Sequence, residues 1–174
     1  MKAWPILATV LAAVGVFTLA PRLAGQEVRV EGIATSSPKR ADKLVLTDEQ
    51  WRQRLTPEQF RILRSKGTEP AFCGVNLDHQ GDGVYHCVGC DLPLFKAKTK
   101  FNSRTGWPSF FEPVSNDSVW FKRDTSFGMV RTGVLCARCD GHLGHVFDDG
   151  PPPTGLRYCI NGTVLKFKAA DRRR

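Results

Sequence analysis

The last third of the chain concentrates residue types that carry thiol and proton-transfer chemistry. Cys159 stands alone in an apolar, strand-like run, and His142 and His145 lie shortly before it. The thiolate is the nucleophilic form of cysteine, and a nearby positive charge makes it available near neutral pH. Free cysteine is also among the most buried residue types. On spacing alone, Cys159 is therefore either a nucleophile or a small buried hydrophobe.

Two Cys-x-x-Cys pairs form a second group, Cys87/Cys90 and Cys136/Cys139. Each pair places two sulfurs on a tight turn, and two such turns supply the four thiolates of a tetrahedral zinc site. Because four protein ligands leave no open coordination position, we expect Zn2+ to have a structural role here. Disulfides and a thioredoxin-like redox pair are the alternatives, although a redox Cys-x-x-Cys normally accompanies a βαβ unit, which the sequence lacks.

The elements that would position these residues are mainly strands. Short apolar stretches alternate with Gly, Pro, Asn and Asp turns, which predicts antiparallel strands in a sandwich- or barrel-like core. The expected strands are Val84–Val88, Ser118–Phe121, Met129–Cys136, His145–Phe147 and Tyr158–Phe167. Before them, Thr47 with Gln50 and Thr56 with Gln59 have the pattern of capping boxes. Two short helices are therefore expected on the N-terminal side of a mainly β domain.

The ends of the 174-residue chain differ in character from its middle. Residues 1–26 have an early lysine and then an uncharged apolar run, which is typical of a signal peptide or a short membrane anchor. We therefore expect an exported protein, periplasmic or membrane-anchored and facing outside the cytoplasm. Residues 27–43 are expected to be a polar linker, 44–170 the folded domain and 171–174 a basic tail.

The net charge of +8 raises the question of an acidic partner. Basic residues are scattered over the chain and are not interleaved with aromatic residues as on a nucleic-acid-binding stripe. We therefore interpret the charge as a soluble basic face and expect no nucleic-acid partner.

Five motifs, in this order, resemble the peptide-methionine (R)-S-oxide reductase family. They are GTEPAF at 67–72, CxxC at 87–90, FNSRTGWPSFF at 101–111, CxxC at 136–139 and HLGHVFDDGPPPTGLRYCINGTVLKF at 142–167. The resemblance covers residues 46–168. It implies two antiparallel sheets with N-terminal helices, and reduction of methionine-R-sulfoxide in oxidised proteins.

The resemblance also implies catalytic roles. Cys159 matches the nucleophile, which attacks the sulfoxide sulfur, releases methionine and becomes a sulfenic acid. His142 and His145 match the two histidines that orient and protonate the sulfoxide oxygen. Asn161 matches an active-site asparagine, although Asn161-Gly162 is also an ordinary turn signal.

Three further residues are expected around the substrate. Trp107 matches the tryptophan that packs against the substrate methyl group, and Phe147 is expected in the same pocket. Either ring would equally suit a plain core position. Arg157, together with the histidines, is a candidate for the positive charge that favours the Cys159 thiolate.

One position departs from the family pattern. Many members carry a resolving cysteine in an FNSGCGWPSF motif, where this chain has Thr105, which cannot form a disulfide. Cys73 is the remaining cysteine outside the two pairs. We expect Cys73 to attack the sulfenic acid and form a Cys73–Cys159 disulfide, which a thioredoxin-like donor then reduces. The alternative is an inert Cys73, with Cys159 reduced directly.

Two other function classes compete with the reductase. A zinc-ribbon binding module without catalysis would leave Cys159 dispensable. A disulfide oxidoreductase would use Cys87/Cys90 as a reversible pair. Neither class gives a role to GWPSF and RYCIN together.

Overall fold

In the computed structural model, residues 27–170 are described, so the expectations for residues 1–26 and 171–174 lie outside the described part. The helices are α1 (Asp48–Arg54) and α2 (Pro57–Leu63). The strands are β1 (Gly83–Cys87), β2 (Pro93–Lys96), β3 (Lys100–Phe101), β4 (Ser109–Phe110), β5 (Val119–Asp124), β6 (Arg131–Cys136), β7 (His142–Phe147), β8 (Arg157–Ile160) and β9 (Leu165–Ala169). No helix among these residues has the length and apolar character needed to cross a membrane.

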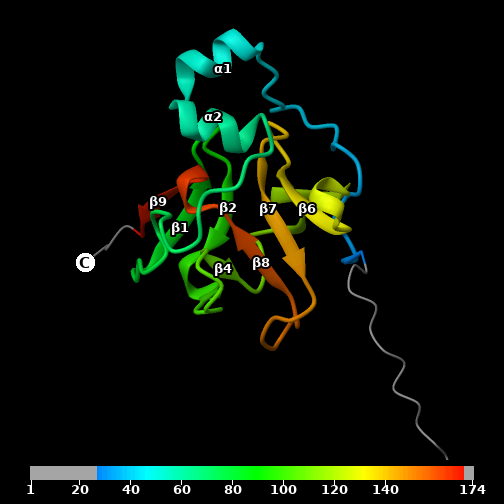
Figure 1. Cartoon of the computed structure of the whole chain (residues 1–174), viewed down its shortest axis with the longest axis vertical. Coiled ribbons are helices and arrows are strands. Elements are labelled where there is room, and N and C mark those ends of the chain that lie inside the picture. Colours follow the sequence, from blue (N-terminus) through cyan, green and yellow to red (C-terminus); the bar gives the residue numbers. More distant parts are fainter. Residues whose placement is uncertain (1–26, 171–174) are drawn as a thin grey trace, which may run out of the picture.

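The strands form two antiparallel sheets. One has the order β2-β1-β9 and the other β3-β4-β8-β7-β6-β5. The helices lie together at one end of the molecule, where α2 contacts β7 (Figure 1). The prediction of a mainly β domain with two antiparallel sheets and short N-terminal helices is confirmed.

Both helices begin where the capping boxes predict. The Thr47 hydroxyl accepts a hydrogen bond from the Gln50 amide, and the Gln50 side chain accepts one from the Thr47 amide. Thr56 and Gln59 repeat this arrangement, with proline at the first helical position of α2. Each box satisfies amides that the helix itself leaves unpaired. The helices bury Trp51, Ile62 and Leu63 in the hydrophobic core, where Trp51 and Leu63 lie near Gly89 of the first Cys-x-x-Cys turn.

An aromatic cluster joins the two sheets. Phe95 of β2 stacks on Phe110 of β4 at a centroid distance of 4.5 Å. Tyr85 of β1 meets Phe110 edge-on at 5.2 Å, and Tyr158 of β8 lies 5.7 Å from Phe95. All four side chains are fully buried. Such pairs add about 0.5–1.5 kcal/mol each beyond the area they bury, so the cluster helps fix the sheets against one another.

The predicted strand Tyr158–Phe167 is wrong as a single element. Its first part is β8 of the larger sheet and its last part is β9 of the smaller one, with a 3-10 turn (Gly162–Val164) between them. The amides of Gly162 and Thr163 donate to the buried carboxylate of Glu69, 2.5 and 2.9 Å away. These bonds hold the turn at which the chain leaves the larger sheet. The run therefore connects the two sheets instead of extending one.

Residues 27–46, which we call the N-terminal strap, contain no helix or strand but pack against the domain. This segment includes the predicted linker 27–43. The amide of Val28 donates to Thr132 Oγ1 over 2.8 Å, and the amide of Phe121 donates to the carbonyl of Ala34 over 2.8 Å. Ile33 is buried in the core. The strap therefore runs beside β5 and β6 before reaching α1 (Figure 1).

Candidate active site and metal centre

Strand pairing places Cys159 and His145 opposite each other. In the register of β7 with β8, His145 pairs with Cys159, and on the other side Cys159 pairs with Ser109 of β4. Directly paired residues of antiparallel strands project to the same face, with Cβ atoms about 4.5–5.5 Å apart. The three side chains therefore form a row across the centre of the larger sheet.

An irregularity in β7 brings the second histidine to the same face. Residues three apart on a regular strand point to opposite faces. Val134 pairs with Gly144 and Leu135 with His142, so β7 advances two residues while β6 advances one, which is a β-bulge. The rings of His142 and His145 consequently lie 5.2 Å apart. The predicted strand began only at His145, whereas β7 begins at His142.

Gly144 is needed at the bulge. A Cβ at this position would collide with the backbone carbonyl of Cys159 on the neighbouring strand. The absent side chain lets β7 and β8 approach at the point where His145 faces Cys159.

The Cys159 thiol is half-buried, and burial dominates its electrostatics. Burial raises the pKa of Cys159 above its ordinary value, while Thr105 and Arg157 oppose this rise. The Thr105 hydroxyl lies 3.8 Å from the Cys159 sulfur. Arg157, one candidate for the positive charge that favours the thiolate, therefore acts in the expected direction, but burial outweighs it. The net shift raises the pKa, which favours the protonated thiol, so the attack requires a base.

His145 is suited to be that base because a carboxylate orients it. Its Nε2 lies 2.6 Å from Asp124 Oδ2. Burial lowers the pKa of His145, and the hydrogen bond with Asp124 opposes the shift. Burial, followed by the neighbouring His145, lowers the pKa of His142 to about 4. Both imidazoles are therefore mainly neutral at pH 7 and available to accept a proton.

Asp124 is a site residue that the sequence analysis missed. It belongs to β5, and it reaches His145 across β6 at Gly133, where no side chain blocks the way. Its other oxygen accepts from Ser126 Oγ at 2.6 Å and the Ser126 amide at 3.0 Å. Although burial opposes it, these bonds and His145 hold the pKa of Asp124 well below its usual range. The predicted strand ended at Phe121, so the carboxylate was not considered.

Glu69 is the second residue that was missed, and it connects three parts of the site. Its amide donates to Asn161 Oδ1 over 2.9 Å, and its carbonyl accepts from Trp107 Nε1 over 3.1 Å. Its buried carboxylate fixes the turn after Asn161, as described above. Asn161 Nδ2 also donates to the carbonyl of Leu143 over 2.9 Å. The buried Asn161 amide thus ties β7 to the GTEPAF segment, and GTEPAF itself was the available sequence signal for Glu69.

The aromatic candidates lie in two places. Trp107 and Phe72 line a cavity of about 630 Å3, whereas Cys159 and the two histidines do not line it. Phe147 pairs with Arg157, whose guanidinium lies 4.3 Å over the Phe147 ring. A forked ion pair with Asp149, at 2.8 Å for both bonds, holds Arg157 in place. Arg157 is two residues from Cys159 and therefore projects to the same face of β8.

Cys73 is exposed, and it is not bonded to Cys159. Its loop is held against the segment that touches the nucleophile, because the amide of Phe72 donates to the carbonyl of Gly106 over 2.8 Å. The neighbouring residue, Thr105, contacts the Cys159 sulfur. Position 105 is thus directly beside Cys159, and Cys73 lies on the adjoining loop.

The remaining four cysteines, which we call the cysteine cluster, converge in the core. The sulfurs of Cys87, Cys90, Cys136 and Cys139 all lie within 4.8 Å of one another. The Cys87–Cys139 and Cys90–Cys136 separations are 3.8 and 3.4 Å. These values are too long for disulfides, whose S–S bonds are about 2.0 Å. They fit a tetrahedral zinc site, since Zn–S bonds of about 2.3 Å place sulfurs about 3.8 Å apart.

Both Cys-x-x-Cys turns have the same backbone geometry. The amide of Asp91 donates to the carbonyl of Cys87 over 2.8 Å, and the amide of Asp140 donates to the carbonyl of Cys136 over 2.9 Å. Asp91 and Asp140 have left-handed φ angles of 62° and 57°. Because one turn follows β1 and the other follows β6, the cluster joins the two sheets.

Comparison with known proteins identifies what this arrangement is similar to. Residues 55–169 match the family model described as the SelR domain. A peptide methionine sulfoxide reductase MsrB of Thioalkalivibrio sulfidiphilus is 58% identical over 127 residues, which are 73% of this chain and 93% of the relative. The MsrB of Thiobacillus denitrificans is 54% identical over 139 residues, 80% of this chain and 100% of the relative. That of Pseudomonas entomophila is 57% identical over 129 residues, 74% and 98% of the two chains.

Proposed function

This chain belongs to the SelR family of peptide methionine sulfoxide reductases of the MsrB type, and from that premise we propose how its residues reduce methionine-R-sulfoxide. It is an oxidoreductase that returns the oxidised side chain to methionine. The observation that carries the mechanism is the direct pairing of His145 with Cys159 across β7 and β8. This pairing places a nucleophile and a candidate base on the same face of neighbouring strands, and such a base activates a thiol when the two side chains come within hydrogen-bond reach.

The first step oxidises Cys159 and reduces the substrate. The Cys159 sulfur attacks the sulfoxide sulfur as the thiol proton passes to neutral His145. This attack joins the Cys159 sulfur to the substrate sulfur. His145, held by Asp124, then returns the proton to the sulfoxide oxygen, and the resulting hydroxyl passes from the substrate sulfur to the Cys159 sulfur as the S–S bond breaks. Cys159 becomes a sulfenic acid, methionine is released, and the two sulfurs exchange two electrons and one oxygen atom. His142, with its low pKa, lies beside His145 and assists in orienting the oxygen.

The second step returns the enzyme to its thiol form. The Cys73 sulfur attacks the sulfur of the Cys159 sulfenic acid, the S–OH bond breaks, and water and a Cys73–Cys159 disulfide result. A dithiol donor of the thioredoxin type then reduces this disulfide and is itself oxidised. The exposure of Cys73 and the contact of its loop with the segment 103–107 support this assignment.

A single turnover without reductant tests the role of Cys73. Wild-type protein is expected to release one methionine per chain and lose two free thiols. Cys73→Ser is expected to release one methionine and keep a sulfenic acid that dimedone traps. Turnover with thioredoxin should fall sharply in this variant while single-turnover methionine release persists. Unchanged turnover with thioredoxin would show that Cys73 is not the resolving residue.

The cysteine cluster is proposed to hold a structural zinc ion. All four sulfurs are available to the metal, which would leave no coordination position for substrate. When bound, the ion supplies a cross-link between the sheets, and no catalytic step passes through it. The convergence of both pairs on one point disfavours a reversible Cys87/Cys90 redox pair, and the MsrB relatives favour catalysis over a binding module.

Export is also proposed. The support is the composition of residues 1–26, an apolar run after an early lysine, which suits a signal peptide or an anchor. An exported enzyme meets oxidised envelope or secreted proteins and needs an exported dithiol donor. Cell fractionation checks this proposal, which recovery of the intact protein from the cytosol alone would refute.

A further inference from the structure

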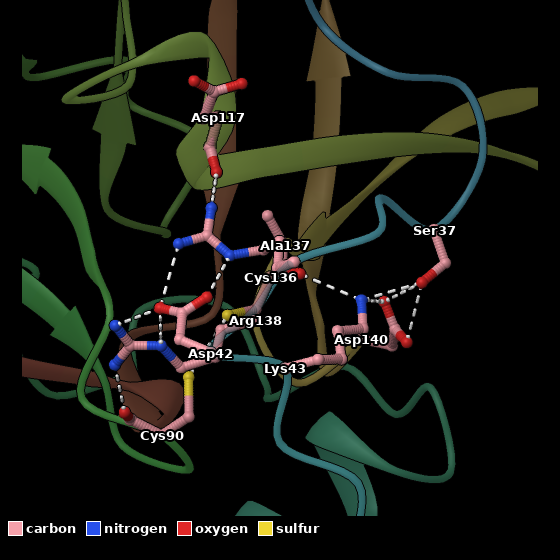
Figure 2. Close-up of polar contacts among 10 residues, drawn as sticks. Ser37, Asp42, Lys43, Cys90, Asp117, Cys136, Ala137, Arg138 and Asp140 are labelled. Atoms are coloured by element: carbon pink, nitrogen blue, oxygen red, sulfur yellow. Dashed lines mark hydrogen bonds and ion pairs between the residues drawn. The ribbon is translucent and has the colours of Figure 1, made fainter.

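The N-terminal strap contacts the second Cys-x-x-Cys turn, Cys136–Cys139, directly (Figure 2). Lys43 Nζ donates to the carbonyl of Ala137 at 2.9 Å and to Asp140 Oδ1 at 2.8 Å. Ser37 Oγ also donates to Asp140 Oδ1, at 2.8 Å. The amide of Leu44 donates to the carbonyl of Arg138, the third residue of the turn, over 2.9 Å. The strap therefore holds both the backbone of this turn and the aspartate that follows it.

Arg138 extends this contact to the first turn. It lies between Cys136 and Cys139, and its Nη1 donates to the carbonyl of Cys90 over 3.0 Å. Its Nε and Nη2 lie 2.8 and 2.7 Å from Asp42 Oδ2. Figure 2 shows the resulting chain of contacts, from the strap through Asp42 and Arg138 to Cys90. One guanidinium thus connects the two halves of the cysteine cluster, and a strap carboxylate fixes its orientation.

Asp42 is itself held in place. The guanidinium of Arg40 donates to both of its oxygens, over 2.7 and 3.0 Å, and to the carbonyl of Asp117 over 2.9 Å. A planar guanidinium and a carboxylate joined by two bonds have a defined mutual geometry, which a lysine ammonium does not provide.

The first turn, Cys87–Cys90, is followed by an aspartate that forms an equivalent ion pair, but with a lysine from a different element. Asp91 pairs with Lys168 of β9 at 2.5 Å, as Asp140 pairs with Lys43 of the strap at 2.8 Å. β9 lies within the SelR match, whereas the strap precedes its first residue, 55. The lysine that pairs with the aspartate of the second turn therefore belongs to a segment outside the residues matched by the SelR domain.

We propose that the strap is a clamp that slows the loss of zinc from the cysteine cluster, with Asp42, Lys43 and Arg138 as positioning residues. The proposal depends on zinc occupying the cluster. The ion escapes only when the two turns separate, and separation requires the Arg138–Cys90 contact to break. Partners beyond the direct ligands hold those ligands in binding geometry, and their loss typically costs about 10–100-fold in metal affinity.

The test is the rate of zinc release from the zinc-loaded full chain into excess EDTA, well below the unfolding temperature. Asp42→Asn and Lys43→Met are expected to release zinc about tenfold faster than wild type. Asp42→Glu, which keeps a carboxylate, should recover most of the retention. Asp48→Asn, an exposed aspartate on α1, is the matched control and should behave as wild type.

The outcomes separate the clamp from the zinc assignment. Release rates for Asp42→Asn and Lys43→Met equal to wild type would overturn the clamp, as would equal acceleration in the control. Zinc-free wild-type protein after reduced purification would overturn the zinc assignment and the clamp together. Reductase activity with dithiothreitol, measured on the same samples, tests the proposed reaction independently of both.

Discussion

Replacing Asp124 with asparagine is expected to lower kcat/KM for methionine-R-sulfoxide by about 10²–10³-fold. The 2.6 Å contact fixes the orientation of the His145 ring and stabilises the imidazolium that forms when His145 takes the thiol proton. Asparagine fills a similar volume but carries no charge, and its amide can present a donor to Nε2. The orientation, the tautomer and the stabilisation of the charge are then all disturbed.

The pH profile separates this role from a structural one. Asp124 raises the pKa of His145, so its removal lowers that pKa. The acid limb of kcat/KM, which reports protonation of the base, should therefore move to lower pH while the plateau falls. Asp148→Asn is a suitable control because this exposed carboxylate follows β7 without an ion pair among residues 27–170. Activity of folded Asp124→Asn within about threefold of wild type would contradict the assigned role, since a positioned proton-transfer group contributes about 10²–10⁴-fold.

Loss of one sulfur from the cysteine cluster is the second large effect. Cys136→Ser is expected to abolish tight zinc binding and lower Tm by about 10–20 °C. The reason is that a structural zinc site contributes about 10–16 kcal/mol in zinc-finger peptides. A loss of only about 5 kcal/mol already corresponds to such a shift for a domain of this size. The cluster joins the turn after β1 to the turn after β6, so its loss removes one of the links between the two sheets.

Cys73→Ser is the matched control for this experiment, because it removes a thiol that lies outside the cluster. Its zinc content and Tm should equal those of wild type. Calorimetry and elemental analysis of both variants measure the two quantities together. An unchanged Tm and one zinc per chain in Cys136→Ser would show that the cluster is not a structural metal site.

Local sequence signals predicted the local structure well. The capping boxes at Thr47 and Thr56 depend on residues three positions apart, and both helices begin there. The alternation of apolar stretches and turns is also visible within short segments, and it predicted the antiparallel sheets. The short strand β4 escaped notice because two residues are too few to show a period.

What the sequence could not show depends on contacts between distant residues. Asp124 reaches His145 only because β5, β6 and β7 lie side by side with a glycine between the two side chains. Glu69 fixes the turn after Asn161, although it lies 93 residues before its partner Gly162 in the sequence. The bulge that brings the histidines to one face appears only once β6 and β7 are paired. The family resemblance predicted that the candidate residues lie close together. It did not predict the strand pairing, the bulge and the distant contacts that bring them together.

The most direct test of the central claim is reduction of separated R and S epimers of a blocked methionine sulfoxide with dithiothreitol as reductant. Wild type and Cys159→Ser would be compared as zinc-loaded, folded proteins. We predict that wild type consumes the R epimer only and that Cys159→Ser consumes neither. Consumption of R by Cys159→Ser at the wild-type rate would contradict the assignment of the nucleophile. Failure of wild type to consume either epimer would contradict the enzymatic function itself.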